Sequence, residues 1–76
     1  MEIEVHNALV DRAKTKNDGI YSYKGYTIVI KDKNFVAYSD RRGNLFRVSG
    51  YFGTPIGKID GYPYPHKIKD ALKKLL

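Results

Sequence analysis

The fold is decided by one stretch, YTIVIKDKNFVAYSDRRGNLFRVS, which runs from Tyr26 to Ser49. It contains three segments of strand-forming residues separated by two short polar loops, Asp32-Lys33-Asn34 and Arg41-Arg42-Gly43. A three-residue hairpin loop places one residue in the left-handed conformation, which Asn and Gly tolerate best. The stretch therefore predicts a three-stranded antiparallel meander with strands at about 26–31, 35–39 and 45–49.

The two loops also predict a register, which places Val29 opposite Ala37 and Tyr38 opposite Phe46. Because side chains alternate across a strand, one face then collects only apolar and aromatic residues, namely Ile28, Ile30, Val36, Tyr38, Phe46 and Val48. The other face is mixed, with apolar and cationic residues, namely Thr27, Val29, Lys31, Phe35, Ala37, Leu45, Arg47 and Ser49. The first face is the predicted core.

Two helices flank the predicted meander. Residues 65–75 form an amphipathic helix that begins at Pro65 and that we expect to pack on the core face. Residues 2–16 carry apolar side chains at helical spacing and form the other helix. This second helix either covers the mixed face, so that the sheet is sandwiched, or lies beside the first and leaves the mixed face open.

The remaining segments complete a single small α+β domain over residues 1–76. Ile20 to Tyr23 is expected as a leading piece of the first strand, with Gly25 at a bend. Residues 50–64 form a loop rich in glycine and proline, which is long enough to hold a short extra strand around Ile56 to Ile59.

The composition limits the function. The chain has 76 residues, no cysteine and a net charge of +6, from 14 Lys and Arg against 8 Asp and Glu. A positive balance favours an anionic partner, either nucleic acid or an acidic protein surface, although charge also serves solubility. No apolar run is long enough for a membrane span, and no signal peptide is evident, so we expect a cytoplasmic protein that does not bind membranes.

The candidate nucleic-acid contacts are the cations of the mixed face and of the two loops. They are Lys31, Lys33, Arg41, Arg42 and Arg47. The two loops lie at opposite ends of the predicted sheet, about 17–20 Å apart, with Arg47 between them. A cationic ribbon of this kind fits the major groove of DNA, and the lysines of the C-terminal helix would add general attraction.

A different class of function is also open. Seven tyrosines are present, and three of them, Tyr51, Tyr62 and Tyr64, lie in or beside the glycine-rich loop as candidate partner-binding residues. They favour a protein-binding inhibitor or adaptor, of the kind that phages encode against host or defence proteins. A third alternative is a homodimer closed through the mixed face or an edge strand.

Catalysis is not expected. The two histidines have no metal-binding spacing, no serine has the context of a nucleophile, and the acidic residues are dispersed along the chain. We therefore predict no catalytic residues, no metal site and no cofactor.

The sequence also has a general outline known from other proteins. The segment Tyr23-Lys24-Gly25-Tyr26-Thr27-Ile28, followed by a hairpin and a closing helix, resembles many small phage and plasmid open reading frames. Three strands plus a helix are similar in outline to integrase arm-binding and AP2-type DNA-binding domains. That resemblance implies a sheet laid in the major groove, but the signature residues of those families are not evident here.

Overall fold

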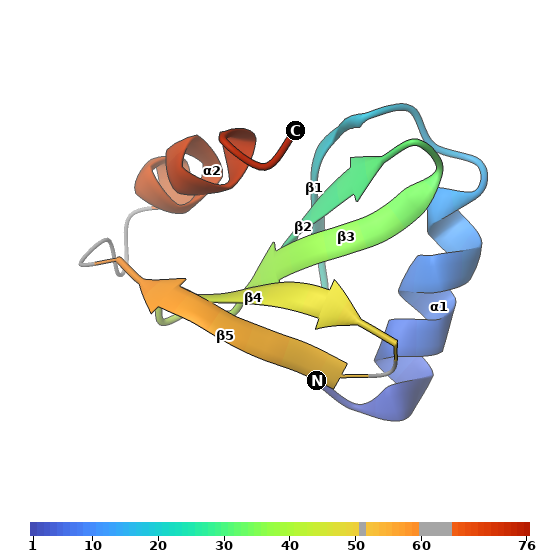
Figure 1. Cartoon of the computed structure of the whole chain (residues 1–76), viewed down its shortest axis with the longest axis horizontal. Helices are drawn as coiled ribbons and strands as arrows, with labels where there is room; N and C mark the ends of the chain where they lie inside the picture. The colour runs from blue at the N-terminus through green and yellow to red at the C-terminus, as the bar shows by residue number, and fades with distance from the viewer. Residues whose placement is uncertain (51, 60–64) are drawn as a thin grey trace.

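The computed structural model describes residues 1–50, 52–59 and 65–76. Within these residues the elements are α1 (Ile3–Ala13), β1 (Gly19–Tyr23), β2 (Tyr26–Lys31), β3 (Asn34–Ser39), β4 (Asn44–Ser49), β5 (Phe52–Lys58) and α2 (Pro65–Lys73). The strands form one antiparallel sheet in sequence order (Figure 1). The predicted α+β class is confirmed, whereas the prediction of three strands is wrong, because this sheet has five.

β1 is a separate strand, where the sequence predicted a leading piece of the first one. Lys24 and Gly25 have φ angles of 47° and 85°, so a two-residue turn turns the chain back and places Tyr23 opposite Tyr26. Two successive positive φ angles are typical of the tight type I′ hairpin turn. The turn was missed because lysine rarely adopts this conformation, and Lys-Gly is a weaker signal than Asn-Gly.

β5 occupies the start of the predicted loop and is longer than the short strand expected near Ile56 to Ile59. Pro55 lies opposite Phe46, and Ile56 is an extra residue where the register with β4 shifts. Proline and bulges are both typical of edge strands, since they prevent further strands from adding. They also remove the alternating pattern, so the sequence indicated only a short strand near the end of this segment.

The predicted register of the second hairpin is confirmed. Ala37 pairs with Arg47, Tyr38 with Phe46 and Ser39 with Leu45. Gly43 has a φ of 87°, and its N–H donates to the carbonyl oxygen of Asp40, which closes the three-residue loop.

The predicted first hairpin is wrong near its loop. Asp32 and Lys33, with φ angles of 53° and 63°, form a two-residue turn, so Lys31 pairs with Asn34 and Ile30 with Phe35. A bulge then restores the predicted pairing of Val29 with Ala37. The bulge places two side chains on the sheet faces opposite to the predicted ones. Phe35 packs in the cluster under α1, and Val36 packs in the cluster under α2.

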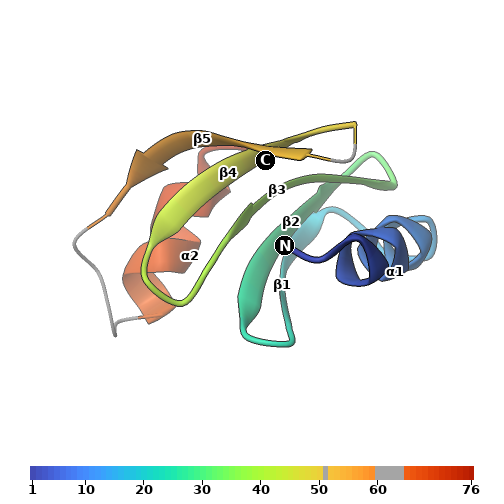
Figure 2. The same ribbon diagram turned by 90° about the horizontal axis from the view of Figure 1, so that it is seen from below.

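The two helices lie on opposite faces of the sheet (Figures 1 and 2). The sheet therefore lies between two helices, as one of the two alternatives predicted. Each helix, however, covers the face that was predicted for the other helix. The first helix, α1, covers the face of Ile28, Ile30 and Tyr38, and α2 covers the mixed face rather than the predicted core face. The mixed face can accept a helix because β1 and the chain after β5 add apolar residues to it, so that α2 packs among Ile20, Val29, Val36, Ala37, Leu45 and Ile59.

The core under α1 is largely aromatic. The ring of Tyr38 stacks on that of Phe46 at 4.8 Å between centroids and meets the edge of Tyr26 at 5.7 Å. Burial raises the pKa of Tyr38, and nearby Tyr26 and Asp40 raise it further. A β-carbon at Gly53 would lie 2.9 Å from the Cζ atom of Tyr38, so only glycine lets β5 pass this ring.

Candidate functional site

The sheet opens between β3 and β4. These strands pair from Ser39 to Ala37 on one side and from Leu45 to Arg47 on the other, and the ladder ends there. Figure 1 shows β4 diverging from the β2–β3 hairpin beyond this point. The bulge in β3 accounts for the divergence, because a bulge bends its strand and increases the local twist. Phe35, packed under α1, holds the start of β3 on that side.

A cleft of about 630 Å³ occupies this opening, and we call it the β3–β4 cleft. It is bounded by the β2–β3 hairpin, the end of β4, one side of α1 and Leu75 beyond the end of α2. Among the described residues, its lining includes four cations and no carboxylate, and the cations are Lys14, Lys31, Lys33 and Arg47. The structure thus brings together three of the five predicted nucleic-acid contacts and adds a fourth cation, Lys14, from α1.

Two of these cations already have partners. The ammonium of Lys33 donates to the carbonyl oxygen of Lys16 at 2.9 Å and to Oδ1 of Asn17 at 3.4 Å. Lys14 lies 3.7 Å from Oδ1 of Asp11, but both side chains are exposed, and an exposed ion pair is weak and easily exchanged.

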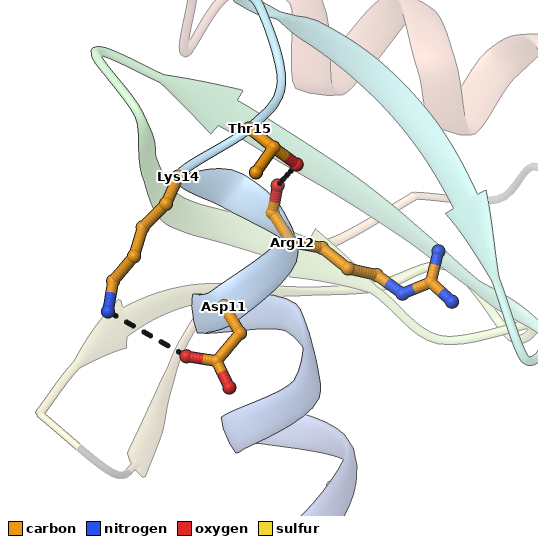
Figure 3. A network of polar contacts seen from close by, with 4 residues as sticks. All are labelled: Asp11, Arg12, Lys14 and Thr15. Atoms are coloured by element: carbon orange, nitrogen blue, oxygen red, sulfur yellow. Dashed lines mark hydrogen bonds and ion pairs between the residues drawn. The ribbon is translucent and has the colours of Figure 1, made fainter.

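Figure 3 shows the end of α1, where Lys14 and Arg12 leave the helix in opposite directions. Lys14 lines the β3–β4 cleft, whereas the Arg12 guanidinium lies over the ring of Tyr23 at 4.7 Å. Thr15 donates its hydroxyl to the carbonyl oxygen of Arg12 at 3.0 Å and so satisfies one of the backbone acceptors at the helix end.

Lys31 and Arg47 are exposed, and neither side chain makes a hydrogen bond or ion pair with the residues that the structure describes. Lys31 extends from the end of β2, and Arg47 stands where the ladder between β3 and β4 stops. A bound anion would therefore gain two charges without breaking an existing contact.

The other two predicted contacts, Arg41 and Arg42, belong to a separate hollow of about 260 Å³ at the tip of the second hairpin. Lys24, Gly25, Tyr26 and Asp40 complete its lining. The Arg41 guanidinium packs over Gly25, where a β-carbon would lie 3.0 Å from its Cζ atom. The structure thus separates these arginines from the β3–β4 cleft, as the predicted positions of the two loops imply.

Asp40 holds this tip in place. Its Oδ1 accepts hydrogen bonds from the backbone N–H groups of Arg42 and Asn44, and its Oδ2 accepts one from the side chain of Asn44. Burial by itself would raise the pKa of Asp40, but the hydrogen bonds from Asn44 and Arg42, with the charge of Arg42, lower it overall. Asp40 is therefore a structural carboxylate that serves the hairpin.

A third group of cations lies against the aromatic rings of β1, and sequence reasoning missed it. Lys16 stands 5.5 Å from the centre of the Tyr21 ring, and Lys24 stands 5.6 Å from that of Tyr23, which Arg12 also covers. Cations over ring faces at these distances are attracted by the ring quadrupole. This group could have been predicted from the sequence, because Tyr21 and Tyr23 lie two residues apart, on one face of a strand, and follow a helix with a basic end.

The remaining predicted site residues are not placed. Tyr51, Tyr62 and Tyr64, the candidate partner-binding tyrosines, lie outside the described residues. Among the residues that are described, no group of three or more His, Cys, Asp or Glu side chains is arranged to hold a metal ion. Within the same residues, neither helix has the length and apolar character needed to cross a membrane.

Three comparisons with known proteins bear on the identity of the chain. No family model matches the sequence. Neither the curated proteins nor the solved structures yield a significant match. Function is therefore inferred from the residues of the cleft and its surroundings.

Proposed function

We propose that this protein binds nucleic acid through the β3–β4 cleft, without catalysing a reaction. The observation that carries the proposal is the lining of the cleft, whose described residues include four cations and no carboxylate, and two of these cations make no side-chain hydrogen bond or ion pair with other described residues. Lysine and arginine neutralise the phosphates of nucleic acids, and each neutralised phosphate releases a counterion, which favours binding. The net charge of +6 adds long-range attraction.

The mode of binding differs from the one that the sequence suggested. An open three-stranded sheet could enter the major groove of DNA, but here a helix packs against each face of the sheet, mainly at β1 to β3. The cationic cleft opens instead at the end of the sheet, where β3 and β4 diverge.

A second candidate is binding to an acidic protein surface. β1 is an edge strand, and Arg12, Lys16 and Lys24 stand beside it with exposed charges. An extended acidic segment could add to this edge by backbone pairing, which is a known mode of peptide recognition. In this case the three cations beside β1, rather than those of the cleft, would control the affinity for the acidic partner.

The test is fluorescence anisotropy with labelled oligonucleotides at salt concentrations from about 50 to 300 mM. Binding through the cleft should weaken log-linearly with salt, with a slope of about −1.5 to −3 for two to four contacts to a single strand. The variant K31E/R47E should reduce the size of that slope by about 1.4 and lower the affinity at every salt concentration.

The matched control is K58E/K69E, because Lys58 and Lys69 are exposed and neither lines the cleft. Both double variants lower the net charge from +6 to +2, since each change from a cation to glutamate removes two charges. If the two variants lose affinity equally, net charge alone drives binding and the cleft is not the site. If the wild-type protein binds no oligonucleotide at low salt, the proposal fails as a whole.

A further inference from the structure

The β3–β4 cleft has a second property besides its charge, which is an apolar interior. Its cations share the lining with Val10, Phe35, Val36, Val48 and Leu75. The volume of about 630 Å³ falls within the range of about 300–1,000 Å³ that is typical of sites for small organic groups. Contacts to phosphates alone would not require these apolar residues.

We propose that the β3–β4 cleft receives one unstacked base of a single-stranded nucleic acid, while Lys31 and Arg47 hold the neighbouring phosphates. The inference rests on the proposed function and specifies its substrate. A nucleobase has two apolar faces, so it can pack against Val10 and Leu75 on the walls of the cleft.

A duplex cannot use the cleft in this way. Its bases are stacked and paired, and extracting one costs unstacking energy that a single strand does not lose. The two helices pack against opposite faces of the sheet, mainly at β1 to β3, so that part of the sheet has no open face for a groove. The protein should therefore prefer single strands.

The test compares four probes of equal length with the wild-type protein at about 100 mM salt. They are a mixed-sequence single strand, the corresponding duplex, an abasic strand with the same phosphates and poly-glutamate. The single strand should bind about tenfold more tightly than either the duplex or the abasic strand, since contacts to a base contribute about this factor or more. Poly-glutamate should bind more weakly than the single strand.

The matching variants are V10S and I56S. Val10 lines the cleft and is 36% exposed, and Ile56 is 47% exposed on β5 outside it, so neither change should unfold the protein. V10S should lower single-strand affinity about fivefold and leave the salt slope and the duplex affinity unchanged. I56S should leave all of these values unchanged.

Equal binding of the abasic strand and the normal strand would overturn the inference and leave the proposed function standing, because phosphates alone would then suffice. Duplex preference, or an unchanged affinity in V10S, would overturn it in the same way. If poly-glutamate binds and nucleic acid does not, both the inference and the proposed function are wrong.

Discussion

Replacing Asp40 with alanine should lower the free energy of unfolding by about 2 kcal/mol. The carboxylate accepts three hydrogen bonds, at 2.9 Å from the Arg42 N–H, 3.0 Å from the Asn44 N–H and 2.8 Å from the Asn44 side chain. A hydrogen bond to a charged group contributes about 1.5–3 kcal/mol, and partial exposure to water brings the total well below three such bonds. For a chain of this size, about 2 kcal/mol corresponds to a fall in Tm of about 8–16 °C.

The effect should also depend on pH. The folded protein lowers the pKa of Asp40, because the hydrogen bonds from Asn44 and Arg42 outweigh the burial that would raise it. The unfolded chain therefore holds the proton more tightly, so this stabilisation is present above about pH 4 and is lost as the pH falls through the folded-state pKa. D40N, which retains one acceptor, should lose about 1 kcal/mol at pH 7 and much less at pH 3.

Urea unfolding followed by circular dichroism at pH 7 and pH 3 measures these differences. The control is D70A, because Asp70 forms an exposed ion pair with Lys73 at 3.8 Å, and its loss should stay within about 0.5 kcal/mol. If D40A were as stable as D70A at pH 7, the hydrogen bonds of Asp40 would not hold the hairpin. If each variant lost as much stability at pH 3 as at pH 7, the lowered pKa of Asp40 would not contribute to stability and the titration argument would be wrong.

Three other substitutions test the hairpins by the same unfolding assay. F35A should cost about 3 kcal/mol, because Phe35 is 6% exposed in the core under α1, whereas V36A should cost about 1 kcal/mol; a larger loss for V36A would contradict the bulged register. K24N should raise the free energy of unfolding by about 0.5 kcal/mol, because asparagine tolerates the φ of 47° at this turn better than lysine does. A loss of stability in K24N would argue against a type I′ turn.

The two hairpins show what the sequence could and could not predict. Gly43 is the only glycine between Tyr26 and Ser49, so the second loop had one natural site for a left-handed residue and its register was predicted correctly. In the first loop Asp32 and Lys33, rather than Asn34, adopt positive φ. The predicted three-residue loop and the observed two-residue turn differ by one residue, and the bulge in β3 takes up that residue. The pairing of Val29 with Ala37 is therefore the same in the prediction and in the structure.

The assignment of helices to faces depended on an element that the sequence did not separate. Once β1 is a strand, Ile20 joins Val29 and Ala37 on the mixed face, and that face becomes apolar enough for α2. Without β1, Lys31 and Arg47 made the same face look open to solvent. Helical periodicity identifies the apolar side of a helix but does not say which sheet face it covers.

The candidate site was predictable only in part. The predicted register placed Lys31 and Lys33 at one end of the sheet and Arg47 between the two loops, whereas in the structure all three line one cleft. The contribution of Lys14 and the opening of the sheet could not be predicted, because both depend on how the bulge in β3 twists the hairpin toward α1. The cations beside Tyr21 and Tyr23 likewise become neighbours of these rings only when α1 packs on the sheet.

The most direct test of the central claim is to map the binding surface by NMR. The amide signals of the 15N-labelled protein are followed while an unlabelled single-stranded oligonucleotide is added at low salt. Binding in the β3–β4 cleft predicts that the largest shifts occur at Val10, Lys31, Val36, Arg47 and Val48. Shifts concentrated at Tyr21 to Lys24 or at Arg41 and Arg42, or no shifts at all, would contradict the assignment of the cleft as the binding site.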